Sequence, residues 1–476
     1  MSISMTDLLR SHDLVKNPFT EEEAQNDTVY EELINESSYT FNHQSWDRFF
    51  GDPPGRGTSI LFGIKGSGKT AIRRAMEKNI EHHNAHADDR ILLIRYTDFN
   101  DFLDTCRRKA NSGRQRHGEA GLEDYGLTQH LDAILSCGVD ALLVELERDP
   151  TLLERLPPHQ KQDLDLILAL YLRGSPDQFG RIINAYKPHL AVQYTLGARL
   201  SFWMNRTGNA IVTLGMGPLL RYIFFKRVAQ AVDREILVRE RQPHDSYIAI
   251  QNLPQDYLRN LNLDQPQWRN DEDIRRQFMH RFIDLCRSMD FRQVVIIMDK
   301  VDEPSLINGH KGRMEQFVWP LWNNRILQLD PNLSFKMLLP SQLYESVRKA
   351  TGDKANEARF DKQKIIYPFR WSNHQLYDMM SDRLRICRGD RHTPYPLSNL
   401  FDQTIEKEKI LAVLEKLRQP RFVLNYLYRL LAEACANQEY EPDQPVRVNR
   451  EVFYRVTANI EEDIKEYYQN LGENPD

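Results

Sequence analysis

The stretch that decides the fold is GIKGSGKT, residues 63–70. It fills every fixed place of the pattern G-x-x-x-x-G-K-[ST], in which the backbone N–H groups of a glycine-rich loop surround phosphates and the lysine reaches the outer ones. A glycine-rich surface turn can match the same pattern by accident. The flanking residues decide between these readings, because the loop works only between a strand and a helix.

The flanks favour the phosphate-binding reading. Residues 58–62, TSILF, follow a stretch rich in proline and glycine and are typical of a short buried strand. From residue 71 onward, apolar residues recur at helical spacing and charged residues occupy the other face. The first turn of that helix would direct free N–H groups and the positive end of its dipole at an anion. The predicted phosphate-binding residues are Gly63, Gly66, Ser67, Gly68, Lys69 and Thr70.

Composition narrows the class of protein. The 476 residues exceed an ordinary single domain, and the hydrophobic share of 41% is enough for a core. The net charge of −5 gives no overall sign of binding to a polyanion, and the five cysteines lack a C-x-x-C pair, which favours a reducing compartment. The start lacks an apolar signal region, and the least polar segment, 207–220, is shorter than the ~20 residues of a membrane helix. We expect a cytoplasmic protein without a membrane partner.

Further strands are predicted at residues 90–96, 292–298, 334–339 and 364–367, with helical patterns between them. About 190 residues separate the second strand from the third, and their helical periodicity around 131–146 and 164–172 indicates an inserted set of helices, not a loop. The first fifty residues read as helical and polar, and everything from Ser372 onward reads as helix.

These patterns predict an α/β protein: the three-layer parallel sheet of a P-loop NTPase, with a long helical insertion and a C-terminal helical lobe. The predicted parts are an N-terminal helical segment (1–50), the first part of the NTPase core (51–100), the helical insertion (101–290), the second part of the core (291–371) and the C-terminal lobe (372–476).

A carboxylate is predicted to complete the site. Five apolar residues, 294–298, lead to Asp299 at the carboxyl edge of the sheet, where such folds bind ligands. Thr70 and Asp299 would hold Mg²⁺ together, and Asp302 or Glu303 would position the attacking water. The simpler alternatives are a turn residue that closes a strand, for Asp299, and a solvated acidic pair before Pro304, for the other two.

The order of motifs resembles that of a known group. GIKGSGKT is followed by IIMDKVDE, FKMLLPSQL, WSNHQLYDMMSDR and the triplet Pro420-Arg421-Phe422. This order is similar to that of the P-loop ATPases that include the STAND and KAP ATPases and the AAA-type replication initiators. The resemblance implies a regulatory switch that binds and hydrolyses ATP with Mg²⁺, self-assembles as a homo-oligomer or controls a partner effector, and acts in a bacterial antiphage setting. Two alternatives stay open: a DNA- or RNA-stimulated ATPase of initiator or transposition-helper type, and a small-molecule kinase.

The resemblance also implies roles for single residues. The residue after the metal-binding Asp is usually a second acid in this group, but here it is Lys300, so the catalytic carboxylate is expected at Glu303 or Asp302. Ser341 stands where the group keeps a sensor of the γ-phosphate, and Arg421 where it presents a nucleotide-sensing arginine. Their ordinary alternatives are a helix cap for Ser341 and a surface charge for Arg421.

Two weaker assignments come from the same resemblance. Arg325 is a candidate finger that completes the site of a neighbouring subunit, and its simpler alternative is a surface arginine. Phe19, which follows Pro18, is a candidate for stacking on adenine, although such a residue usually belongs to the core. ATP is favoured over GTP because no guanine-recognition motif of the N/TKxD type follows a strand.

Overall fold

A computed structural model of the whole chain describes residues 3–36, 39, 41–51, 57–113, 122–171, 271–324, 327, 330–349, 360, 363–437 and 445–471. Segment 207–220, residues 172–270 of the expected insertion, and Arg325 lie outside these ranges. The helices before the third strand are α1 (Met5–Ser11), α2 (Thr28–Asn35), α3 (Trp46–Phe49), α4 (Lys69–His86), α5 (Asn100–Gly113), α6 (Leu127–Arg148), α7 (Pro158–Tyr171) and α13 (Glu272–Ser288). Those after it are α14 (Lys311–Trp322), α16 (Tyr344–Lys349), α18 (Asn373–Ile386), α19 (Lys407–Leu417), α20 (Pro420–Asn437) and α21 (Arg450–Leu471).

The sheet has five strands in the order β2-β3-β4-β1-β5, and every neighbouring pair is parallel. The strands are β1 (Ser59–Gly63), β2 (Arg90–Tyr96), β3 (Phe291–Met298), β4 (Leu333–Pro340) and β5 (Lys364–Ile366). The predicted α/β class, the parallel sheet and all five strands are confirmed, with strand ends that differ from prediction by at most one residue. Because the strands are parallel, the glycine-rich loop after β1, Ser341 after β4 and Asp299 after β3 lie at the same edge of the sheet, and β4 lies between β1 and β3.

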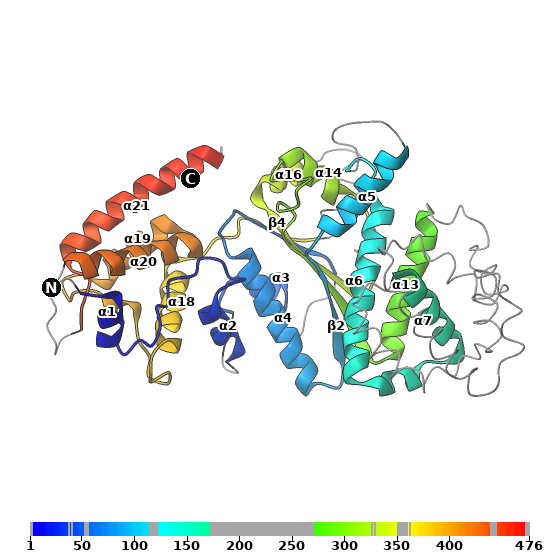
Figure 1. Cartoon of the computed structure of the whole chain (residues 1–476), viewed down its shortest axis with the longest axis horizontal. Coiled ribbons are helices and arrows are strands. Elements are labelled where there is room, and N and C mark those ends of the chain that lie inside the picture. Colours follow the sequence, from blue (N-terminus) through cyan, green and yellow to red (C-terminus); the bar gives the residue numbers. More distant parts are fainter. Residues whose placement is uncertain are drawn as a thin grey trace, which may run out of the picture.

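Helices cover both faces of the sheet (Figure 1). On one face, Ile72 and Met76 of α4 belong to the same buried cluster as Leu61 and Val295 of the strands. On the other face, α6 packs against β2 and α13 against β3, and their buried residues share a cluster with the strand residues that alternate with these, such as Ile60 and Ile296. The alternation follows from the two-residue period of a strand, and it makes three layers.

Helix α6 is a core helix. Among the residues that the structure describes, it is the one helix long and apolar enough to cross a membrane, but 67% of that apolar window is buried inside the fold. Burial of this kind is expected of a helix packed between a sheet and a second helix, since such a helix is apolar around most of its circumference. The periodicity around residues 131–146 and 164–172 thus predicted α6 and α7 correctly.

The N-terminal segment, which was expected to be helical and polar, forms the short helices α1, α2 and α3, and its apolar side chains are buried on the inner side. Leu8 of α1 and Phe19 are at most 1% exposed. Helix α1 packs against α20 of the C-terminal lobe, where the backbone N–H of Ile3 donates to the carbonyl of Cys435 at 3.2 Å (Figure 1). Helices α1 and α2 are too short to show a clear period in the sequence, because their seven and eight residues make only about two turns each.

A buried ion pair joins the same segment to the lobe. Arg383 of α18 is 3% exposed and donates to the carboxylate of Asp27 at 2.6 and 3.1 Å and to the carbonyl of Pro18 at 2.7 and 2.9 Å. Asp27 also caps α2 through the N–H groups of Val29 and Tyr30. The turn that begins α2 is therefore held against α18 by a buried charge that is paired and hydrogen-bonded, as burial requires.

Candidate functional site

The loop of residues 63–70 joins the end of β1 to the start of α4. Gly66 and Gly68 have φ of +87° and +94°, a left-handed backbone conformation that favours glycine. Helix α4 begins at Lys69, and no side chain caps it. The backbone N–H groups of its first turn have no partner within the helix, which is the usual arrangement for binding an anion.

Lys69 and Ser67 line this loop. The Lys69 ammonium donates to the carbonyl oxygens of Gly63 at 2.8 Å and of Ile64 at 3.1 Å, so it lies over the loop itself. The Ser67 hydroxyl is buried and has no hydrogen-bond partner among the residues described. A Cβ on Gly63 would lie 2.5 Å from that hydroxyl, which explains the glycine. A positive charge and an unused polar group at one loop fit a bound phosphate.

Asp299 follows β3 and is 1% exposed. Its Oδ2 accepts from the Thr70 hydroxyl at 3.2 Å and from Nε of Arg73 at 3.1 Å, and its Oδ1 accepts from the backbone N–H of Lys300 at 2.9 Å. The fold thus brings together the two predicted metal ligands, which are 229 residues apart in the chain.

A hydroxyl and a carboxylate are ligands that Mg²⁺ accepts. Within the described part of the chain, no group of three or more His, Cys, Asp or Glu side chains could hold a metal ion by itself. An ion at Thr70 and Asp299 would therefore take its other ligands from phosphate and water, which is how Mg²⁺ is usually bound beside nucleotides. The donor set fits Mg²⁺ on that condition.

Arg73 is a site residue that was not predicted from the sequence. Its local pattern places it on the charged face of a helix, yet its guanidinium reaches both Asp299 and Glu77, the latter at 2.7 Å. Nε of Arg95 lies 3.2 Å from the other oxygen of Glu77. The available signal was the spacing, because residues 70 and 73 of one helix share a face, so a partner of Thr70 is within reach of Arg73.

The acids after Asp299 lie on a tight turn. Lys300 has φ of +66°, which is uncommon for a residue with a side chain, and its carbonyl accepts from the N–H of Glu303 at 3.2 Å. The Glu303 carboxylate is 59% exposed and lies 3.2 Å from the Lys300 ammonium. The carbonyl of Asp302 accepts from the N–H of Gly309 at 2.9 Å. The choice between Asp302 and Glu303 as the water-positioning acid stays a prediction.

The C-terminal lobe touches the loop directly. A Cβ on Gly66 would lie 3.2 Å from Cβ of Arg421 and 2.9 Å from Oε1 of Gln419, and a Cβ on Gly68 would lie 3.7 Å from the ring of Pro420. Arg421 therefore stands beside the glycine-rich loop, where the resemblance expected it. Gln419, 2% exposed, was missed because nothing local marks the residue before a helix as a contact of a distant loop.

Trp371 also ties the lobe to the loop. Its indole N–H donates to the carbonyl of Ser67 at 2.8 Å, and its ring packs edge-on against Phe41, His43 and Phe369. Burial lowers the pKa of His43 to about 4, so the ring is neutral at ordinary pH and adds no charge beside the loop. Trp371 begins the motif WSNHQLYDMMSDR, but its local sequence predicts no role for it at the loop.

Two other predicted residues are placed by the fold. Ser341 begins a short 3₁₀ turn, η4 (Ser341–Leu343), directly after Pro340, which pairs with Gly63 in the register of β4 and β1. It therefore stands at the same sheet edge as the loop, and Pro340 occupies the cap position that was the alternative for Ser341. Phe19 is 1% exposed and lies in the core, so its ring has no open face for a base.

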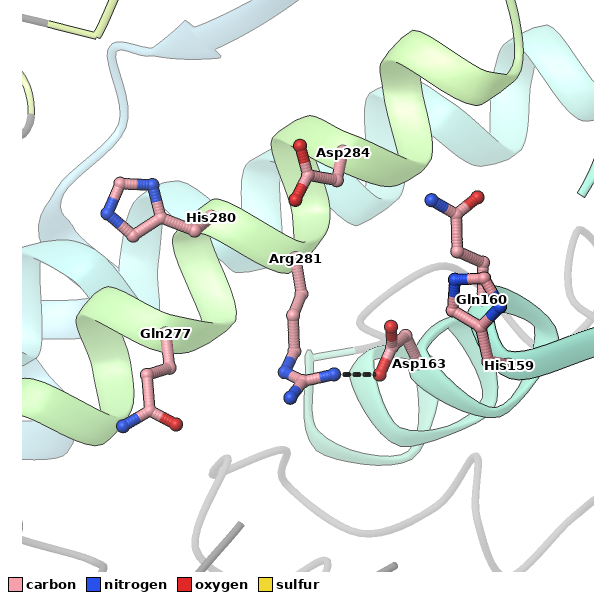
Figure 2. Close-up of a pocket in the computed structure, with 7 residues that line it drawn as sticks. All are labelled: His159, Gln160, Asp163, Gln277, His280, Arg281 and Asp284. Atoms are coloured by element: carbon pink, nitrogen blue, oxygen red, sulfur yellow. Dashed lines mark hydrogen bonds and ion pairs between the residues drawn. The ribbon is translucent and has the colours of Figure 1, made fainter. Parts of the chain in front are cut away.

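A separate pocket of about 370 Å³ lies between α7 and α13. Figure 2 shows Arg281 of α13 and Asp163 of α7 pointing toward each other across it, joined by an ion pair. The remaining lining side chains are His159, Gln160, Gln277, His280 and Asp284. His280 and Gln277 project away from that pair, so the polar groups do not converge on one point (Figure 2).

Comparisons with known proteins identify no relative. No protein-family model matches the chain, and neither does any curated protein or solved structure. The resemblance to the P-loop ATPase group therefore rests on the motifs, and the function is inferred from the geometry of the site.

Proposed function

We propose that this chain binds ATP with Mg²⁺ in the loop of residues 63–70, hydrolyses it, and uses the nucleotide state as a switch. The observation that carries the proposal is the 3.2 Å contact between the Thr70 hydroxyl and the Asp299 carboxylate. It joins a complete phosphate-loop sequence to an acid at the end of a buried parallel strand, which is the pair of features that nucleotide hydrolysis requires.

Each residue has a stated task in this proposal. When nucleotide binds, the Lys69 ammonium leaves the carbonyl oxygens of Gly63 and Ile64 and donates to the outer phosphates, while the loop N–H groups hold the inner ones. Thr70 and Asp299 hold Mg²⁺, which when bound neutralises charge on the phosphate oxygens. Glu303 or Asp302 positions the attacking water.

The contacts of the C-terminal lobe support a switch. Trp371 hydrogen-bonds the loop at Ser67, while Gln419 and Arg421 stand against Gly66. A phosphate that enters this loop would attract the Arg421 guanidinium and displace the side chain of Gln419, which lies closest to Gly66. The nucleotide would in this way set how the lobe sits on the sheet, as expected of a regulatory ATPase.

The finer parts of the proposal come from the resemblance alone. These are self-assembly as a homo-oligomer, control of a partner effector, and action in bacterial antiphage defence. The alternative is an ATPase stimulated by DNA or RNA. In that case nucleic acid would change the rate of hydrolysis at the same site. Both versions require nucleotide binding first.

The test is a titration of the chain with a fluorescent ATP analogue in the presence of Mg²⁺. Lys69→Ala should weaken binding about 10–100-fold, because it removes charge-assisted hydrogen bonds to phosphate. Lys65→Ala is the matched control: it removes the same charge from an exposed position of the same loop and should bind almost as well as the parent chain. Equal affinities for all three chains would reject the proposal.

A second experiment separates the versions. ATP and GTP hydrolysis is measured for the chain alone, with DNA and with RNA, and light scattering with and without a non-hydrolysable ATP analogue reports assembly. Nucleotide-dependent association without stimulation by nucleic acid supports the self-assembling switch. Strong stimulation by DNA or RNA supports the alternative, and binding without any hydrolysis identifies a switch that is not an ATPase.

A further inference from the structure

One oxygen of Asp299 serves two donors. The Thr70 hydroxyl and Nε of Arg73 both reach Oδ2, at 3.2 and 3.1 Å, while the backbone of Lys300 occupies Oδ1 at 2.9 Å. The side chains of Asp299 and Arg73 are 2% and 11% exposed, so water competes little for these bonds. In this arrangement a guanidinium stands where a metal ion bound by Thr70 and Asp299 would have to approach.

A divalent cation and a guanidinium repel each other strongly when both contact one carboxylate in a site shielded from water. Arg73 has a second acid within reach, because its Nη1 donates to Glu77 at 2.7 Å one helical turn away. Glu77 is also paired with Arg95, so two cations already share its carboxylate. The guanidinium is thus held between Asp299 and Glu77.

We propose that Arg73 is a positioning residue that competes with Mg²⁺ for Asp299. It stabilises the buried carboxylate while no metal is bound, and it shifts fully to Glu77 when Mg²⁺ arrives with the nucleotide. This inference rests on the proposed function. As a consequence, Arg73 and Glu77 of α4 set the Mg²⁺ concentration needed for tight nucleotide binding. Neither residue contacts the phosphates or the metal.

The proposal predicts opposite effects for two neighbouring substitutions. Arg73→Ala should lower the Mg²⁺ concentration at half-maximal ATP binding by about tenfold, since removing a charged hydrogen-bond partner leaves Asp299 open to the metal. Glu77→Gln should raise that concentration, because Arg73 loses its alternative partner and stays on Asp299. Lys78→Ala, which removes a cation of the same helix that pairs with Glu81, should change nothing.

The measurement is a Mg²⁺ titration of ATP binding, with the affinity in excess EDTA as the baseline. Thermal denaturation of each variant without ligands confirms folding. The rise in Tm caused by Mg²⁺ in the presence of pyrophosphate, which supplies the phosphate ligands that the ion needs, gives a second readout. Arg73→Ala should gain stability from Mg²⁺ at lower concentration than the parent chain, and adding Asp299→Asn to it should abolish that gain.

The outcomes are distinguishable. A higher Mg²⁺ requirement in Arg73→Ala would overturn the proposal and show that Arg73 instead orients Asp299 for the metal. An unchanged requirement in both variants would also overturn it. If the parent chain binds no ATP at any Mg²⁺ concentration, the proposed function fails, and the response of Tm to Mg²⁺ with pyrophosphate still decides whether Arg73 competes for Asp299.

Discussion

Glu23 and Arg421 form an ion pair beside the candidate site, with 3.6 Å between Oε1 of the acid and Nη2 of the arginine. The contact belongs to a series made by residues 22–25. The amide of Asn425 donates to Glu22 at 2.7 Å, and the ammonium of Lys300 donates to the side chain of Gln25 at 2.6 Å. The N-terminal segment therefore links the C-terminal lobe to the turn after Asp299, and Glu23 holds the arginine that a phosphate would attract.

Removing this competitor should strengthen nucleotide binding. We expect Glu23→Gln to bind ATP up to about fivefold more tightly, because a largely exposed ion pair contributes about 0–1 kcal/mol. Glu21→Gln makes the same charge change two residues away at an exposed position and should have no effect. Equilibrium titration with ATP checks both, and weaker binding by the Glu23 variant would show that the acid supports the site.

Substitutions of the acids in the turn after β3 should distinguish ATP binding from the hydrolysis step. Asp299→Asn should weaken Mg²⁺-dependent ATP binding itself, since it removes the anionic ligand. Glu303→Gln should leave ATP bound and slow hydrolysis by roughly 10²–10⁴-fold, as for a lost general base, with Asp302→Asn milder. Single-turnover hydrolysis with parallel binding measurements decides. A dead Asp302 variant beside an active Glu303 variant would reverse the assignment.

Gly66 should not accept a side chain. Gly66→Ala combines an unfavourable left-handed backbone with a Cβ placed 2.9 Å from Gln419 and 3.2 Å from Arg421, so we expect lower stability and loss of ATP binding. Gly57→Ala is the control: its φ of +84° is similar, but among the residues that the structure describes its Cβ would meet no atom within 4 Å. It should lower Tm through backbone strain alone and leave ATP affinity unchanged.

Adding Gln419→Ala to Gly66→Ala tests the contact directly. The shorter side chain removes the closest atom, so part of the lost ATP binding should return, whereas backbone strain at residue 66 is unaffected. A double variant no better than Gly66→Ala would mean that the lobe does not press on the loop at this point.

Lys336 should make stability depend on pH. It is buried in β4, its ammonium donates to the Ser59 hydroxyl at 3.1 Å, and burial lowers its pKa to about 7. The unfolded chain, with a lysine pKa of roughly 10.4, binds more protons between pH 7 and 10, so the free energy of unfolding rises with pH across that range.

The Lys336→Met variant should lose this rise and be more stable at pH 7, by about 1–4 kcal/mol, because a methionine of similar volume carries no charge into the core. Urea denaturation at pH 7 and 9.5 measures both effects. Lys364→Met, on the exposed part of the neighbouring strand β5, should keep most of the dependence. A parent chain equally stable at both pH values would contradict the argument.

The loop and the strands were predictable because their signals are local. A glycine pattern, a run of apolar residues or a helical period occupies fewer than about twenty neighbouring residues, and short-range sterics and burial act on that scale. Asp299 was also predictable, since a buried strand in a parallel sheet must deliver the next residue to the carboxyl edge. Arg325 and residues 172–270 lie outside the structural description, so the finger and most of the insertion stay predictions.

The sequence by itself determined the α/β class, the glycine-rich loop of residues 63–70 and the placement of Thr70 and Asp299 at strand and helix ends. Only the tertiary structure decided that Arg73 shares an oxygen of Asp299, that Trp371 and Gln419 lie against the loop, and that Glu23 holds Arg421. Each of these contacts joins segments far apart in the chain. Their pairing depends on how α4, the N-terminal segment and the C-terminal lobe pack together, and packing is set by the combined burial of many side chains, which no local pattern encodes.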